Sequence, residues 1–134
     1  MSRDVLEADG AAAAARDNLE ALLDSAALPD LPAGFADAAQ HYVALLLSAN
    51  QRLNLTRVMQ PADVARLHLL DALAALPILD QRAPRSALDL GSGGGVPGIP
   101  LALARPDVRW TLVDSIGKKA QASRAKKAPK RRRA

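Results

Sequence analysis

A cluster of glycines constrains this chain more than any other feature of its sequence. Five of the eight residues in 91–98 are glycine, directly after the short apolar run 87–90, which is typical of a buried strand. Residues 100–105 then supply leucine and alanine for a helix, and residues 108–113 form a second apolar run that ends at Asp114. The sequence therefore predicts a β-α-β unit whose first turn is the glycine segment.

Three helix-forming stretches precede this unit. Residues 10–28 are rich in alanine and leucine and end at Pro29, and residues 35–52 carry apolar side chains at helical spacing. The third stretch begins near Pro61, where proline suits a first helical turn, and continues to Pro77. We therefore expect the part of the chain before the glycine segment to be helical.

The basic residues are unevenly distributed. Seven of the chain's 18 basic residues lie in residues 122–134, which hold none of its 14 acidic residues. The formal net charge of +4 therefore depends on this tail, and the rest of the chain has an excess of acids. The tail otherwise contains only alanine, serine and proline, which cannot bury a core, so we expect it to be disordered.

The composition excludes several classes of protein. No stretch approaches the length of a membrane span, and the acidic N-terminus is unlike a signal peptide, so we expect a cytoplasmic protein. The chain has no cysteine and two histidines, which excludes disulfides and thiol nucleophiles and argues against a metal centre.

The glycine segment has the context of a nucleotide-binding loop, because a strand precedes it and a helix follows it. The alternative is that the glycine segment is a flexible connector that binds no ligand. A Walker loop is excluded because no Lys-Ser or Lys-Thr pair follows the glycines. A dinucleotide fingerprint on Gly93, Gly95 and Gly98 fits poorly, because its first glycine lies three residues beyond the strand. An acid in the strand followed by alternating glycines at 91, 93 and 95 is typical of S-adenosylmethionine-dependent methyltransferases.

Two acidic residues support a ligand at this loop. Asp89 lies at the end of the first strand, where a buried carboxylate is costly unless it orders the glycine loop or meets a cationic ligand. Asp114 ends the second strand, where a carboxylate can accept hydrogen bonds from ribose hydroxyls. The alternative for Asp114 is an ordinary turn residue. Both positions predict a ligand at the carboxyl edge of the sheet.

Over roughly residues 40–121 the chain resembles the bacterial small-subunit ribosomal RNA methyltransferase G family, also called the glucose-inhibited division protein B family. The segments that carry the likeness are 53–56 (LNLT), 68–73 (HLLDAL), 89–102 (DLGSGGGVPGIPLA) and 112–119 (LVDSIGKK). The glycine loop followed by Pro-Gly-Ile-Pro is far more specific than a bare methyltransferase loop.

The resemblance implies an α/β chain: N-terminal helices in residues 1–84, then the first β-α-β part of a Rossmann-like methyltransferase fold in residues 85–121, before the tail. It also implies transfer of a methyl group from S-adenosylmethionine to N7 of a guanine. The implied partner is 16S ribosomal RNA or a precursor of the small ribosomal subunit. Separately, we expect a monomer that binds no metal and no membrane. Guanine N7 already exposes a lone pair, so no catalytic acid or base is expected.

The resemblance also assigns roles to residues. Gly91 and Val96 are expected to contact the cofactor, Gly93 and Gly95 to shape the loop, and Asp114 to face the ribose. Asp89 is also expected to belong to the cofactor site.

Two further positions have less defined roles. His68 and Asp71 lie three apart on the expected third helix, and we expect them to brace it against the loop in preference to contacting RNA or cofactor. Leu67 and Ala72 stand where the family usually has a basic residue and a serine. Two lysines, at 118 and 119, are candidates for RNA phosphate contacts or ordinary solvated residues.

The likeness ends near residue 121, although members of the family are considerably longer. Our expectation is a C-terminal truncation by a frameshift or premature stop, which would leave the first strand unpaired on one edge and impair folding and activity. The rival hypotheses are an inactive fragment, a methyltransferase of the same fold with another substrate, and a non-enzymatic RNA-binding protein that acts through its basic tail.

Overall fold

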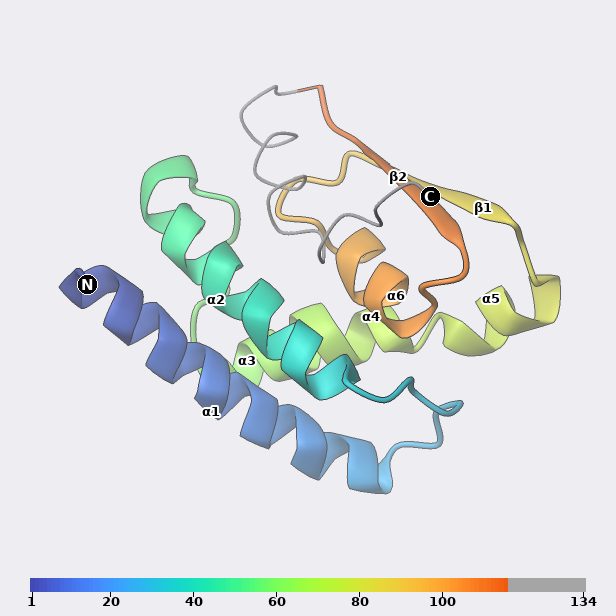
Figure 1. Ribbon diagram of the computed structural model, residues 1–134, viewed down its shortest axis with the longest axis horizontal. Coiled ribbons are helices and arrows are strands. Elements are labelled where there is room, and N and C mark those ends of the chain that lie inside the picture. The colour runs from blue at the N-terminus through green and yellow to red at the C-terminus, as the bar shows by residue number, and fades with distance from the viewer. Residues whose placement is uncertain (116–134) are drawn as a thin grey trace.

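The computed structural model describes residues 1–115, and the predicted tail and the lysines at 118 and 119 lie outside this range. Two long helices, α1 (Arg3–Ser25) and α2 (Phe35–Leu53), pack side by side and run in opposite directions (Figure 1). A broken helical segment follows them, and a small parallel β-α-β unit completes the described chain.

The first helix begins and ends earlier than the sequence predicts. It starts at Arg3 because the side chain of Ser2 caps it by accepting a hydrogen bond from the backbone of Val5. It ends at Ser25, and Ala26 is already extended. The prediction of residues 10–28 was therefore wrong at both ends, whereas α2 agrees with the predicted 35–52 to within one residue.

The third predicted helix is real but irregular, and its predicted end at Pro77 is wrong, because the helix ends at Leu73 and Pro77 lies in the first turn of the next one. It consists of α3 (Pro61–Asp63), the π-helix η1 (Val64–Leu70) and α4 (Asp71–Leu73), after which α5 (Leu76–Arg82) continues the chain. The π-helical part is wound more widely than an α-helix, and such segments are frequent at functional sites. The sequence pattern indicates a helix here but not its π-helical winding.

The predicted β-α-β unit is confirmed. Strands β1 (Ser86–Leu90) and β2 (Arg109–Val113) pair in parallel, with Ala87 opposite Trp110, and α6 (Gly98–Ala104) connects them. Figure 1 shows α6 lying between this sheet and the long helices. On the opposite face of β1, Leu88 and Leu90 are exposed.

One hydrophobic core joins the helical region to the β-α-β unit. It includes alanines of α1, the apolar face of α2, parts of the π-helix and α4, and α6 with Trp110 of β2. Burial of this shared apolar surface is the main force that fixes the helices relative to the sheet. Within residues 1–115, no helix combines the length and apolarity that a membrane crossing requires.

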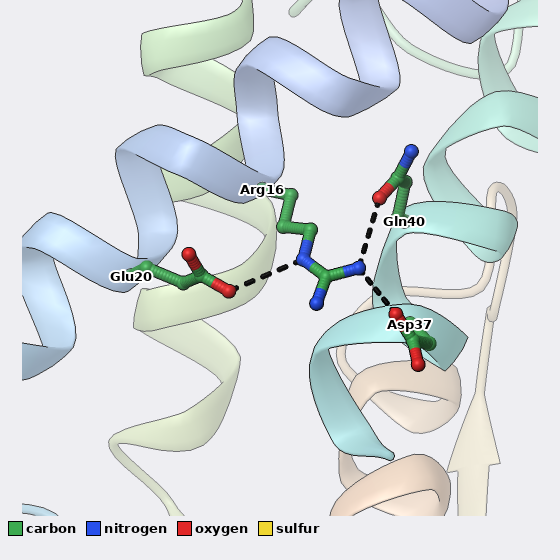
Figure 2. A network of polar contacts seen from close by, with 4 residues as sticks. All are labelled: Arg16, Glu20, Asp37 and Gln40. Carbon is green, nitrogen blue, oxygen red and sulfur yellow. Dashed lines mark hydrogen bonds and ion pairs between the residues drawn. The ribbon is translucent and has the colours of Figure 1, made fainter.

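A polar network joins α1 to α2 at the surface. Figure 2 shows Arg16 of α1 reaching Glu20 one turn away and Asp37 and Gln40 of α2. Because these groups are partly exposed, the network contributes modestly to stability.

Candidate cofactor site

The glycine loop lies at the carboxyl ends of both strands. Gly91 and Ser92 donate their backbone N–H groups to the same acceptor, the carbonyl oxygen of Val113, at 2.7 and 3.0 Å. These bonds extend the parallel pairing beyond β1 and tie the loop to the end of β2. The structure therefore brings together the predicted loop and the end of the second strand.

The alternating glycines 91, 93 and 95 all have positive φ, and Gly95 shows why its position requires glycine. Its φ is +96°, and a Cβ atom there would lie 2.4 Å from Cδ1 of Ile99. A larger residue would therefore be strained in the backbone and would clash with the first turn of α6. Val96, the other predicted contact in this turn, is half-buried.

Asp89 holds the far end of the loop. Its Oδ2 accepts a hydrogen bond from the backbone N–H of Gly98 at 2.9 Å, at the start of α6. Burial raises the pKa of the Asp89 carboxyl, while this hydrogen bond lowers it. The sequence suggests two reasons for a carboxylate here: it orders the glycine loop, or it meets a cationic ligand. The hydrogen bond to Gly98 supports the first reason.

Asp114 lies against the middle of the loop. Its Oδ2 accepts a hydrogen bond from the backbone N–H of Gly93 at 2.7 Å. Asp89 and Asp114, 25 positions apart in the sequence, therefore both bind backbone N–H groups of the glycine segment 91–98. The two acids order the loop from the ends of the two strands.

Tyr42 of α2 is a contact that the sequence analysis missed. Its hydroxyl donates to the carbonyl oxygen of Gly94 at 2.9 Å, and its ring is buried in the core. Burial, and then the negative charge of Asp89, raise the pKa of Tyr42, so the hydroxyl stays protonated and donates. The sequence did contain one signal for such a contact: Tyr42 lies on the apolar face of a predicted helix, and a buried hydroxyl needs a hydrogen-bond partner.

His68 is placed near the loop by a second set of polar contacts. Its Nε2 lies 2.7 Å from Oγ1 of Thr56, which also accepts the backbone N–H of Val58 at 3.0 Å. The side chain of the buried Asn50 accepts the backbone N–H of Thr56 at 2.8 Å. Burial lowers the pKa of His68, although a hydrogen bond with the backbone of Leu67 opposes this effect.

The bracing role expected for Asp71 stays a prediction. Asp71 is exposed at the start of α4, whereas His68 is half-buried against Thr56. The wide π-helical winding between them turns less per residue than an α-helix, so residues three apart do not share one face. Of the two residues, His68 lines a cavity beside the loop.

A partly open cavity of about 160 Å³ lies between the glycine loop, the end of α2 and the π-helix. Its polar lining comes from Thr56, His68 and Ser92, and its apolar lining includes Leu46, Leu55 and Val96. The segments 53–56, 68–73 and 89–102, which are distant in the sequence, thus meet around one cavity.

Comparison with known proteins decides the family. The family model GidB, rRNA small subunit methyltransferase G, matches residues 36–122. The chain belongs to this family. Similar members of the methyltransferase G family include the ribosomal RNA small subunit methyltransferases G of Sorangium cellulosum and Methylobacillus flagellatus. The first is 49% identical over 59% of this chain and 34% of the relative, and the second is 46% identical over 74% of this chain and 47% of the relative.

The chain spans between a third and a half of the length of these methyltransferase G relatives. A third relative, from Anaeromyxobacter, is 53% identical over 55% of this chain and 34% of its own length. No solved structure matches the chain. The match to the family includes the whole glycine loop and both strands, so the suspected family is confirmed.

Proposed function

We propose that this chain binds S-adenosylmethionine at the glycine loop and takes part in methylation of N7 of a guanine in 16S ribosomal RNA. Membership of the methyltransferase G family supports the reaction. The observation that carries the cofactor site is the hydrogen bond between Asp114 and Gly93, because it brings a carboxylate and a glycine-rich turn together at the carboxyl edge of a parallel sheet.

The described residues fit the proposed cofactor. Gly91 and Val96 would contact it, and Gly93 and Gly95 give the turn a shape that lets a ligand approach the backbone. Asp114 would accept hydrogen bonds from ribose hydroxyls. Asp89 would act indirectly, by holding Gly98 and the start of α6.

The proposed reaction needs no side chain that acts as an acid, a base or a nucleophile. S-adenosylmethionine supplies a methyl group on a positively charged sulfur, and guanine N7 offers a lone pair without loss of a proton. The protein's task is therefore to align the two reactants and to exclude water, for which a rigid loop held by Asp89, Asp114 and Tyr42 is suited. The proposed substrate implies a cytoplasmic protein, and we infer that it acts as a monomer on 16S RNA or a precursor of the small subunit.

Equilibrium binding of radiolabelled S-adenosylmethionine to the purified chain tests the cofactor site. We expect saturable binding that unlabelled S-adenosylhomocysteine displaces. Incubation with small ribosomal subunits lacking this modification, followed by mapping of labelled 7-methylguanine, tests the reaction. A chain that binds neither compound, in a preparation that unfolds cooperatively, would refute the proposed cofactor site.

A further inference from the structure

The glycine loop packs tightly against the helical region at Gly94. The hydroxyl of Tyr42 donates to the carbonyl oxygen of Gly94 at 2.9 Å. A Cβ atom on Gly94 would lie 3.2 Å from Cδ1 of Leu46 and 3.3 Å from the carbonyl oxygen of Leu55, which is tighter than ordinary van der Waals contact. No room for a side chain remains here, so the position of the Leu55 carbonyl limits where Gly94 can lie.

Leu55 belongs to an irregular segment that side chains hold in place. Residues 54–58, directly after α2, form no helix or strand. The backbone N–H of Thr56 donates to Oδ1 of Asn50 at 2.8 Å, and Oγ1 of Thr56 accepts the backbone N–H of Val58 at 3.0 Å. A segment without regular backbone pairing depends on such bonds for its shape, so Thr56 is the residue that holds it.

The contact between this segment and the loop follows from the geometry of one peptide group. The carbonyl of Leu55 and the N–H of Thr56 belong to the same planar trans peptide, so they point in opposite directions. The N–H is directed at the buried Asn50, and the carbonyl oxygen therefore faces away from it and lies close to Gly94. Whatever fixes Thr56 thus also fixes the surface against which the loop packs.

His68 of the π-helix η1 holds the side chain of Thr56. Nε2 of His68 lies 2.7 Å from Oγ1 of Thr56, and η1 is anchored in the core by its buried apolar residues. Burial lowers the pKa of His68, and a hydrogen bond with the backbone of Leu67 raises it, as donation of a ring N–H to a carbonyl does. A neutral imidazole donates through one nitrogen only, so Nε2 accepts and the hydroxyl of Thr56 donates to it.

We propose that Thr56 and His68 are positioning residues of the cofactor site, because their hydrogen bond fixes the segment against which Gly94 packs. The glycine loop then keeps the shape in which Gly91 and Val96 would meet S-adenosylmethionine. The inference rests on the proposed function, since it concerns the same loop. Neither positioning residue takes part in methyl transfer, and both act on the cofactor through Gly94.

Two substitutions at position 56 separate the hydroxyl from the packing of the side chain. Thr56→Val keeps the volume and the backbone N–H but removes the hydroxyl, whereas Thr56→Ser keeps the hydroxyl. Binding of radiolabelled S-adenosylmethionine is measured at a temperature at which denaturation curves show every variant to be folded. Thr56→Val should bind about three- to tenfold more weakly than the wild type, the range for one hydrogen bond, and Thr56→Ser about as tightly. Thr111→Val, at an exposed threonine of β2, is the control and should bind as the wild type does.

A double-mutant cycle tests whether the two residues act as a pair. His68→Leu removes the acceptor nitrogen and should weaken cofactor binding about as much as Thr56→Val does. Because both substitutions break the same hydrogen bond, the double variant should bind no more weakly than either single variant. Losses that add in the double variant would overturn the inference. So would wild-type affinity in Thr56→Val, or equal losses in Thr56→Val and Thr56→Ser.

Hydrogen exchange distinguishes failure of this inference from failure of the proposed function. The backbone N–H of Gly95, next to Gly94, donates to the carbonyl oxygen of Ser92 at 2.6 Å within the loop. Its exchange should be faster in Thr56→Val than in Thr56→Ser or the wild type, whether or not the cofactor binds. A wild-type chain that binds no S-adenosylmethionine, together with this faster exchange in the variant, would refute the proposed function alone. Unchanged exchange at Gly95 would overturn the inference.

Discussion

Oδ2 of Asp114 lies 2.7 Å from the backbone nitrogen of Gly93, so the end of β2 and the glycine loop form one unit. The carboxylate that the resemblance assigns to ribose binding thus already orders the backbone that a cofactor would cover. Hydrogen bonds to an ionised acceptor are stronger than those between neutral groups. The Asp114 side chain therefore orders the glycine loop and, in our proposal, also binds the ribose of the cofactor.

Asp114→Ala should weaken binding of S-adenosylmethionine by about 10- to 100-fold, corresponding to about 1.5–3 kcal/mol for a hydrogen bond to a charged group. Calorimetric titration of the purified variant measures this loss. Asp107→Ala, at an exposed aspartate before β2, is the control and should bind as the wild type does. Wild-type affinity in Asp114→Ala would remove Asp114 from the site.

Gly98→Ala should destabilise the chain, because an added Cβ would lie 2.6 Å from Oδ2 of Asp89. Either the hydrogen bond between Asp89 and Gly98 or the start of α6 must shift, at a cost of about 1–3 kcal/mol. Chemical denaturation followed by circular dichroism measures the change in the free energy of unfolding.

The chain offers a matched control for this substitution. Gly10 lies inside α1, and a Cβ atom there would meet nothing within 4 Å. Gly10→Ala should therefore stabilise the chain by about 0.5–1 kcal/mol, since alanine favours the helix. If both substitutions had the same sign, the close approach of Asp89 to Gly98 would not control stability.

Local patterns in the sequence predicted the elements around the site well. The apolar runs before and after the glycines became β1 and β2, and the expected helix became α6. The predicted start of α1 was wrong because Ser2 caps the helix, and a serine before a helix-forming stretch is a signal that the sequence contains. The positions of Asp89 and Asp114 at strand ends also follow from the sequence, because parallel strands bring their carboxyl ends to one edge.

Contacts between distant segments could not be predicted in the same way. Nothing local in the sequence indicates that Tyr42 reaches the carbonyl of Gly94, 52 positions later. The π-helical winding of η1 likewise arises in the packed molecule, and it separates Asp71 from the face that carries His68. The cavity depends on both of these segments. Its existence therefore required the three-dimensional arrangement.

Tyr42→Phe should lower the free energy of unfolding by about 0.5–1.5 kcal/mol, because it removes the hydrogen bond to Gly94 and keeps the buried ring. It should also weaken binding of S-adenosylmethionine, since the loop loses its tie to α2. Thermal unfolding with and without the cofactor separates the two effects. A variant with reduced stability but wild-type affinity would show that α2 supports the fold without shaping the site.

Stability should fall as the pH decreases from about 7.5 to 5.5, in part because of His68. Burial lowers the pKa of His68 in the folded chain, so between the unfolded pKa near 6.5 and the lower folded pKa, the unfolded chain binds the extra proton. The stability that the neutral imidazole contributes is thus complete above the unfolded pKa and is lost as the pH falls below it.

His68→Gln isolates this effect, because glutamine can still hydrogen-bond to Thr56 but does not titrate. The difference in unfolding free energy between wild type and variant should be constant above pH 7.5 and shift in favour of the variant toward pH 5.5. Asp89, whose pKa is raised, acts in the opposite direction but is present in both proteins, so its effect cancels. Denaturation curves at five pH values give the two profiles. Parallel profiles over the whole range would mean that His68 has the same proton affinity in the folded and unfolded chain, and its burial beside Thr56 would then not disfavour the imidazolium form.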